Sequence, residues 1–272
     1  MLHEHPENRR NSQPLQRRFG QGERDISTPG KRVWSSRRPA AATGKSILYV
    51  VLALVLMAAP LASNASAAVY RCANLPISIK AEEKTDPQHI CNSAGDALAF
   101  FDRLNVKLTH PVLIEVVMAL PGSLGESAVG CYQHEEQKVS VLGFPAFSKR
   151  KTWFGVAINQ AMYRSLVTHE VAHAVARCNF AVPEPTLHAE EYVAYVAMFS
   201  MMDPVLRAQI LAANPGEGFE SASEINELTY AFYPMRFGVQ AYRHYRRKEH
   251  GDEFLLKVLS GNVLTNSVLD LP

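Results

Sequence analysis

The sequence has few of the features that mark cysteine-rich zinc modules, repeat proteins or multi-span membrane proteins. Only 4 of its 272 residues are cysteine, and their spacings include no CxxC pair, which excludes a zinc site built from such pairs. No internal repeat or low-complexity tract follows residue 68. The longest apolar run, residues 47–62, is shorter than the roughly 20 residues that a membrane-spanning helix needs.

A large charge of one sign is also missing, because the net charge is only +2 at pH 7. The basic excess is confined to residues 1–45, which hold ten Lys or Arg and four Asp or Glu. Residues 46–272 are left with 18 basic and 22 acidic groups. The folded part therefore lacks the basic character of a nucleic-acid-binding protein, and we expect no nucleic-acid partner.

The N-terminal part of the sequence has the layout of an export signal. Residues 1–45 are poor in apolar side chains, so we expect a disordered basic leader. The apolar run comes after Lys45 and before Ala65-Ser66-Ala67, which fits a small-x-small cleavage site. We interpret residues 46–67 as a signal peptide, or as a membrane anchor if they stay uncleaved. Both interpretations place the rest of the chain in the periplasm or outside the cell.

All four cysteines lie after the predicted signal segment, at positions 72, 91, 131 and 178. An even number of cysteines in an oxidising compartment favours disulfides, so we expect two. Three pairings are open, and the sequence does not choose among them. The alternative is that the four side chains are free, buried thiols.

Residues 68–272 are predicted to form a single α+β domain, because strand patterns come first and helix patterns follow. The expected strands are residues 77–79 and 112–118 and a hairpin formed by residues 130–133 and 138–142. The expected helices are residues 87–104, 155–177, 186–202, 204–213, 223–247 with a kink at Pro234, and 252–259. The pattern indicates a small N-terminal sheet with a hairpin, followed by a mainly helical part.

The central motif is His169-Glu170-Val171-Ala172-His173, which lies within a long helical pattern. Residues four apart on a helix lie one turn apart on the same face, so the two imidazoles point in the same direction. Two histidines at this spacing suit tetrahedral Zn2+, which favours imidazole nitrogen. We therefore predict that His169 and His173 are metal ligands.

Glu170 follows the first histidine directly and borders the same helix face. Zinc lowers the pKa of a bound water toward ~7, so hydroxide is available at neutral pH. A neighbouring carboxylate can accept the proton that this water loses. Glu170 is therefore the predicted catalytic base.

A third ligand is required, because catalytic zinc usually takes three protein ligands and keeps a fourth position for water. The HExxHxxGxxH pattern is excluded, since Ala176 and Asn179 stand where it needs glycine and histidine. The next predicted helix offers His188, Glu190 and Glu191. The residues alone leave the choice among these three open.

The motif together with a glutamate on the following helix resembles the gluzincin metallopeptidases, a clan that includes thermolysin-like and membrane-alanyl-aminopeptidase-like enzymes. In that clan the third ligand stands at a similar distance after the second histidine, often three residues before an alanine. Glu191 matches, since it lies eighteen residues after His173 and three before Ala194. The resemblance therefore implies Glu191 as third ligand, ahead of Glu190 and His188, and a zincin-like metallopeptidase domain.

The resemblance covers residues 128–200, and the hairpin at residues 130–141 resembles the edge-strand region that borders substrate in this clan. Two features depart from the clan's pattern. Tyr195 stands where many members have an Asp or Asn that orients a ligand histidine. No GxMEN-like sequence is present, so aminopeptidase activity is not supported.

A hydrolase also needs a hydrogen-bond donor for the developing oxyanion. In the enzymes that this sequence resembles, a tyrosine or histidine from the C-terminal helices often has this role. Tyr230, Tyr233 and His244 lie in the corresponding part of the chain. The resemblance thus implies Tyr230 and Tyr233 as catalytic candidates, with His244 as a further one. The alternative for each is an aromatic ring that fills the core.

These features predict an exported peptidase that depends on Zn2+ and acts on a peptide or protein substrate. The alternative is a metallopeptidase-like envelope domain with little or no activity that binds a peptide or protein partner. A third interpretation is a metal-free scaffold tethered to the membrane through residues 46–67. It requires the HExxH motif to be accidental.

Overall fold

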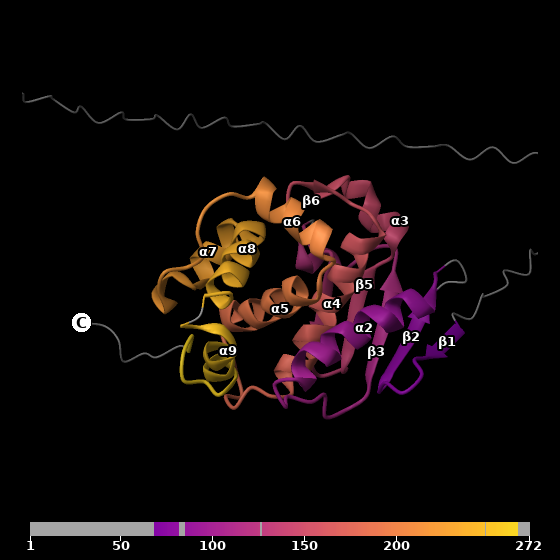
Figure 1. Cartoon of the computed structure of the whole chain (residues 1–272). Coiled ribbons are helices and arrows are strands. Elements are labelled where there is room, and N and C mark those ends of the chain that lie inside the picture. Colours follow the sequence, from indigo (N-terminus) through magenta and orange to yellow (C-terminus); the bar gives the residue numbers. More distant parts are fainter. Residues whose placement is uncertain (1–67, 82–84, 126, 248, 266–272) are drawn as a thin grey trace, which may run out of the picture. The chain divides into compact units, whose positions relative to one another are not determined.

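The computed structural model describes residues 68–81, 85–125, 127–247 and 249–265 (Figure 1). The chain divides into two units, Met1–Ala62 and Ser63–Pro272, and every described residue belongs to the second. The predicted leader and the predicted signal peptide or anchor lie outside the described residues. Within the described residues, no helix is both long and apolar enough to cross a lipid bilayer.

Five short strands form one mixed sheet in the order β1-β2-β3-β5-β4. The strands are β1 (Ala68–Arg71), β2 (Ile77–Ala81), β3 (Val112–Val117), β4 (Gly130–Gln133) and β5 (Lys138–Leu142). The central pairs β2–β3 and β3–β5 are parallel, whereas β1–β2 and β4–β5 are antiparallel. The hairpin predicted from the sequence is therefore β4–β5, and its β4 strand forms an edge of the sheet.

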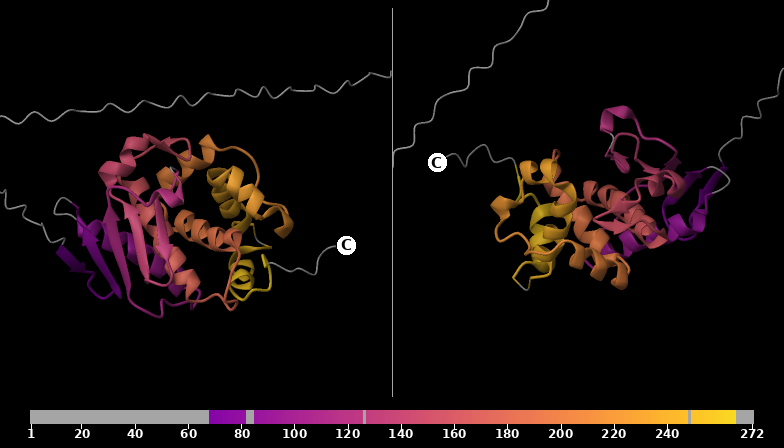
Figure 2. Two further views of the ribbon diagram at one scale, coloured as in Figure 1. Left: turned by 180° about the vertical axis from the view of Figure 1, so that it is seen from behind. Right: turned by 90° about the horizontal axis from the view of Figure 1, so that it is seen from above.

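Side chains alternate between the two faces of the sheet, and one face packs against the helices. Ile79, Ile114 and Val139 are fully buried on that face, whereas Lys80 and Glu115 pair on the other. Helices α2 (Pro87–Asp102) and α4 (Gln160–Arg177) pack against the apolar face and against each other. Figure 1 shows α2 across the strands, and the left view of Figure 2 shows the strands from the opposite side.

The C-terminal half of the chain is helical. Helix α5 (Leu187–Met201) packs between α4 and α8 (Pro234–Tyr245) and is buried along most of its length. The remaining helices are α3 (Phe144–Phe147), α6 (Pro204–Ala213), α7 (Glu227–Phe232) and α9 (Gly251–Leu259), with 3-10 turns at Gly122–Leu124, Ser148–Arg150 and Ala222–Glu224. The predicted mixed α+β architecture, with a small N-terminal sheet, is confirmed.

Two predicted helices differ from the observed ones for local reasons. The helix predicted at residues 155–177 begins at Gln160, because the Asn159 side chain caps it by accepting from the Met162 N–H. The preceding residues form a short hairpin of β6 (Thr152–Trp153) and β7 (Val156–Ala157).

The helix predicted at residues 223–247 is broken rather than kinked at its proline. Helix α7 ends at Phe232, Tyr233 has non-helical backbone angles, and Pro234 begins α8. A proline favours this position because the first turn of a helix needs no hydrogen bond from its nitrogen. Strand β1 was not predicted from the sequence.

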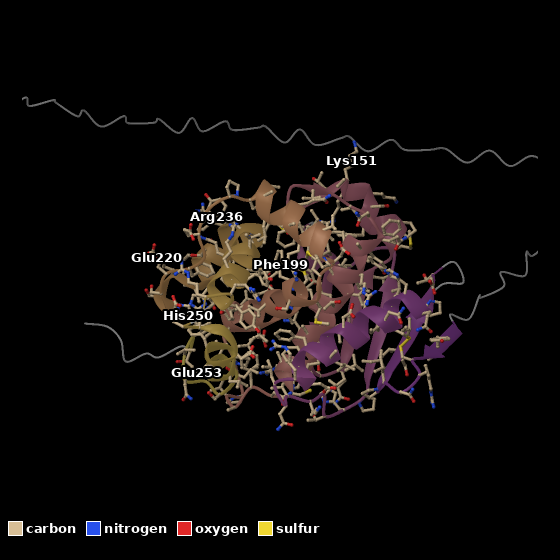
Figure 3. All side chains as sticks on the ribbon, viewed as in Figure 1. Lys151, Phe199, Glu220, Arg236, His250 and Glu253 are labelled. Atoms are coloured by element: carbon tan, nitrogen blue, oxygen red, sulfur yellow. A yellow bond between two sulfur atoms is a disulfide. The ribbon has the colours of Figure 1, made fainter. Side chains whose placement is uncertain are left out.

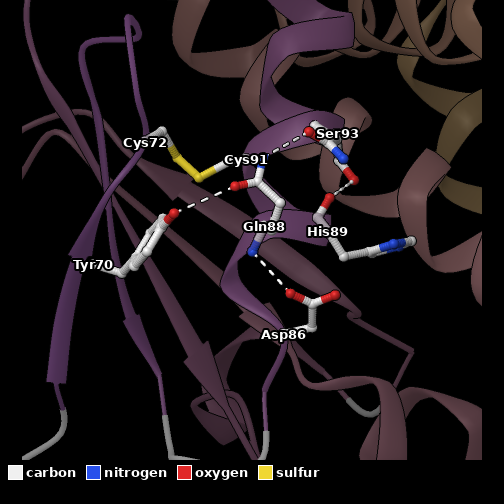
Figure 4. Close-up of a disulfide and its surroundings, with 8 residues drawn as sticks. Tyr70, Cys72, Asp86, Gln88, His89, Cys91 and Ser93 are labelled. Atoms are coloured by element: carbon white, nitrogen blue, oxygen red, sulfur yellow. Dashed lines mark hydrogen bonds between the residues drawn. A yellow bond between two sulfur atoms is a disulfide. The ribbon is translucent and has the colours of Figure 1, made fainter.

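A disulfide between Cys72 and Cys91 joins the segment after β1 to helix α2 (Figure 4). The expectation of two disulfides is therefore corrected to one, because Cys131 and Cys178 are free. Alternation along β4 explains why Cys131 and Cys178 do not pair, because neighbouring side chains of a strand point to opposite faces. The His110 ring contacts both the Tyr132 hydroxyl and the Cys178 sulfur, so Tyr132 points toward Cys178 and Cys131 points to the other face.

The disulfide should stabilise the fold by restricting the unfolded chain. For its sequence separation of 19 residues we expect Cys72→Ser with Cys91→Ser to lower the free energy of unfolding by about 3 kcal/mol. Denaturant unfolding measures this, with Cys131→Ser as the control of a cysteine outside the disulfide. A thiol titration of the unfolded, unreduced chain should find two free thiols. Four thiols, or an unchanged unfolding midpoint in the double variant, would contradict the assignment.

Candidate metal centre

Helix α4 brings the two predicted histidine ligands together. His169 and His173 are one turn apart, and their Nε2 atoms are separated by 3.2 Å. The rings are perpendicular, with centroids 4.7 Å apart. His169 is buried and His173 is half-buried, because α5 and the sheet cover this part of α4. The two imidazoles thus point toward one shared position.

Helix α5 supplies the third predicted ligand. The Glu191 oxygens lie 3.6 Å from the Nε2 atoms of His169 and His173, Oε2 facing the first and Oε1 the second. In a tetrahedral zinc site with bonds of about 2.0–2.1 Å, ligand atoms are about 3.3–3.4 Å apart. Among the described residues, the donor atoms of His169, His173 and Glu191 lie close enough together to hold one metal ion.

The other two ligand candidates have different neighbours. Glu190 lies 3.9 Å from the Arg177 guanidinium. The His188 ring contacts the Thr186 hydroxyl at 3.2 Å, and its Nδ1 is buried without a partner among the described residues. The structure therefore brings Glu191 to the histidines, and neither Glu190 nor His188 belongs to that group.

An unpaired buried atom supports the fit of this group to a cation. Glu191 Oε2 is buried and has no hydrogen-bond partner among the described residues. A buried carboxylate oxygen without a partner costs free energy, which coordination to a metal ion would remove. Two imidazole nitrogens and one carboxylate oxygen are also a donor set that zinc accepts.

Burial sets the protonation of the centre. It lowers the pKa of His169 well below its usual value and that of His173 to about 4, so both imidazoles are neutral and ready to bind a metal near pH 7. Burial raises the pKa of Glu191 to about 8, and the nearby Tyr230 hydroxyl only partly opposes this. Burial, with the Glu191 charge, also raises the pKa of Glu170 well above its usual value.

The side chain of the predicted base, Glu170, extends from α4 to the edge strand β4. Gly130 of β4 approaches it so closely that a Cβ there would lie 2.4 Å from Glu170 Cδ. A side chain at position 130 would displace the carboxylate or the strand. The sequence contains this glycine, but nothing in its local pattern indicates the contact, because 40 residues separate the two positions.

A cleft of about 660 Å³ opens beside these residues. It is bordered by β4 and the residues before it, by the C-terminal half of α4, and by side chains from α5, α7 and α8. Its lining includes Val129, Gly130, Tyr132, His134, Trp153, His169, Glu170, His173, Arg177, Leu187, Glu190, Glu191, Tyr195, Tyr230 and Met235. The three candidate ligands and Glu170 thus face one cavity.

The structure separates the three candidate oxyanion donors. Tyr230, on α7, lines the cleft and lies close enough to Glu191 to affect its pKa. Tyr233 is 61% exposed and lines a different groove, so the structure does not bring it to the centre. His244 is buried, and its Nδ1 contacts the Tyr192 hydroxyl at 2.7 Å, away from the cleft.

Tyr195 supports the centre in a way that sequence reasoning missed. Its ring lies against the His169 ring, with centroids 4.5 Å apart, and it lines the cleft. Gly238 of α8 makes room for it, since a Cβ at that position would lie 2.6 Å from Tyr195 Cδ1. Among the described hydrogen bonds, none joins the Tyr195 hydroxyl to either imidazole. The ring therefore holds His169 by packing.

Comparison with known proteins gives one family match. Residues 77–268 match the model of a family of unknown function, DUF6639. The chain belongs to this family. The match includes β2 to β5 and all of the helices that build the centre, so the candidate ligands lie within the DUF6639 region. No curated protein and no solved structure shows significant similarity to the chain.

The centre should bind one zinc ion per chain. His169→Ala removes a ligand, so we expect the purified protein to lose stoichiometric zinc. His134→Ala, which changes an exposed histidine at the rim of the same cleft, should keep it. Metal analysis after dialysis tests both variants. Zinc at one equivalent in His169→Ala would contradict the ligand assignment.

The metal-free fold should lose stability as the pH rises from 6.5 to 8. Glu191 has a pKa of about 8 in the folded chain and 4.5 as its usual value, so the folded chain binds more protons in this window. Its contribution is present at low pH and is lost as the pH rises through 8. The lowered pKa of His173 makes stability rise with pH instead, but this rise is complete above pH 6.5, the usual pKa of histidine.

Thermal unfolding of the chelated protein across this window tests the sign. We expect the unfolding temperature to fall with pH in the wild type, and the slope to shrink in Glu191→Gln. Saturating zinc should also reduce the slope, because metal binding favours the ionised carboxylate. A metal-free wild type whose stability rises between pH 6.5 and 8 would contradict the assigned protonation.

Proposed function

We propose that this chain is an exported zinc-dependent peptidase with a zincin-like fold. The observation that carries the proposal is the set of three donor groups, His169, His173 and Glu191, whose nearest atoms lie 3.2–3.6 Å apart in a cleft. Glu170 faces the same cleft, as the HExxH motif requires of a base. The resemblance to gluzincins supplies the reaction class, peptide-bond hydrolysis.

The roles of the side chains follow from their positions. A zinc ion held by the three ligands would supply Lewis acidity and make water acidic near neutral pH. Glu170 accepts a proton from the attacking water and delivers it to the leaving amine. Its buried position, which raises its pKa, suits a group that must hold that proton between the two steps. The Tyr230 hydroxyl donates to the developing oxyanion.

The free edge of β4 favours a peptide as the substrate. Leu142 N–H donates to the Val129 carbonyl, so the alternation of the antiparallel ladder turns the backbone groups of Gly130 and Tyr132 away from β5. An extended peptide can add to such an edge as another strand. Both residues line the cleft, so a peptide bound there would pass Glu170 and the metal ligands.

Among the described residues, the disulfide is the feature that supports export, because the predicted signal peptide lies outside them. The Cys72–Cys91 disulfide is compatible with an oxidising compartment such as the periplasm or the exterior. Together with the signal peptide predicted at residues 46–67, it supports a periplasmic or secreted enzyme, or one that stays tethered through those residues.

Glu170→Gln tests the mechanism directly. The change keeps the shape of the side chain but removes its ability to accept a proton, so we expect zinc to remain and hydrolysis to fall by about 10²- to 10⁴-fold. Cleavage of casein and of a peptide library, with and without a chelator, measures this. His134→Ala is the control for a change in the same cleft.

Two results would contradict the proposal. Full activity in Glu170→Gln would exclude Glu170 as the base. A zinc-loaded wild type that binds peptides from the library but cleaves none would instead favour the metallopeptidase-like domain that binds a peptide or protein partner.

A further inference from the structure

Arg177 lies on the same stripe of α4 as the two histidine ligands. Positions 169, 173 and 177 follow one another at four-residue spacing, and all three side chains line the cleft. The Arg177 side chain is only 21% exposed. Among the described residues that line the cleft, it is the only lysine or arginine.

The N–H donors of the Arg177 guanidinium have no hydrogen-bond acceptor among the described residues. The nearest carboxylate oxygen, Glu190 Oε1, is 3.9 Å from Nε, which is longer than a hydrogen bond. No hydrogen bond of Arg177 is found among the described residues. Two half-buried arginines elsewhere differ, since Arg207 and Arg243 each donate to backbone carbonyls at 2.7–3.2 Å.

The Arg177 nitrogens make no hydrogen bond to another described residue, and none of them is among the fully buried unpartnered atoms, so a ligand in the cleft can reach them. The planar fork of the guanidinium fits a carboxylate through two parallel hydrogen bonds. The loose contact with Glu190 leaves the terminal amino groups open to the cleft. A ligand with a carboxylate would therefore complete this part of the site.

We infer that Arg177 binds a carboxylate of the substrate, so that the cleft selects peptides that carry one at a fixed distance from the cleaved bond. This inference rests on the proposed peptidase function. Arg177 lies one helical turn, about 5.4 Å, beyond His173. An extended peptide advances about 3.3 Å per residue, which places the carboxylate roughly two residues from the cleaved bond. Its source is the C-terminus of a peptide or an acidic side chain.

Matched peptides separate the two sources. One pair has a neutral sequence with either a free C-terminus or an amide, and the other has blocked ends with Glu or Gln inside. We expect the zinc-loaded full chain to cleave the carboxylate member of at least one pair with a kcat/KM roughly 10- to 100-fold higher than its neutral partner. The pair that shows the preference identifies the source.

Three variants test whether Arg177 causes the preference. Arg177→Gln should remove it while cleavage of the neutral peptides continues. Arg236→Gln makes the same change in charge at an exposed position on α8, outside the cleft lining, and should leave the preference intact (Figure 3). Glu190→Gln should enlarge the preference, because it removes a carboxylate that competes for Arg177. Zinc content is measured in each variant.

The outcomes separate this inference from the proposed function. Equal cleavage within both pairs, or a preference that survives in Arg177→Gln, overturns the inference and leaves the peptidase function intact. If no peptide is cleaved at all, the peptidase function fails, and binding of the same peptides is followed by fluorescence anisotropy. Binding that depends on the carboxylate and is lost in Arg177→Gln then supports Arg177 as the carboxylate-binding residue. Binding that is absent, or indifferent to the carboxylate, overturns it.

Discussion

The candidate metal centre is defined by one constraint, the burial of the Glu191 carboxyl group beside two imidazoles that burial keeps neutral. In the folded chain its Oε2 atom has no hydrogen-bond partner among the described residues, and a bound cation would satisfy it. The packing of α4 against α5 maintains this arrangement. The centre lies where two core helices meet, with the sheet packed against α4 and α8 packed against α5.

In the proposed function, the edge strand β4 places a peptide substrate beside this centre. Gly130 allows β4 to approach Glu170, and the position of β4 at the edge of the sheet leaves its outer backbone groups without a partner strand among the described residues. The cleft therefore brings the edge of β4, Glu170 and the three candidate metal ligands to one cavity. Arg177 follows the two histidines on the same face of α4, so the proposed recognition and the proposed chemistry share one helix face.

Much of the fold, and the grouping of three side chains that could hold a metal, could be predicted from sequence because the signals are local. The four-residue spacing of His169 and His173 depends only on helix geometry, and the gluzincin resemblance pointed to Glu191. The missed features are contacts between distant segments. The approach of Gly130 to Glu170, the packing of Tyr195 on His169 and the separation of Tyr233 from the cleft depend on how helices and strands pack. The predicted second disulfide failed for the same reason.

X-ray absorption spectroscopy of the zinc-loaded chain would show whether His169, His173 and Glu191 bind the metal, because it reports the atoms around the zinc ion. We expect a four-coordinate zinc with nitrogen and oxygen neighbours at about 2.0–2.1 Å, including the multiple-scattering pattern of two imidazoles. A sulfur neighbour at about 2.3 Å, or a shell without imidazole, would contradict this expectation.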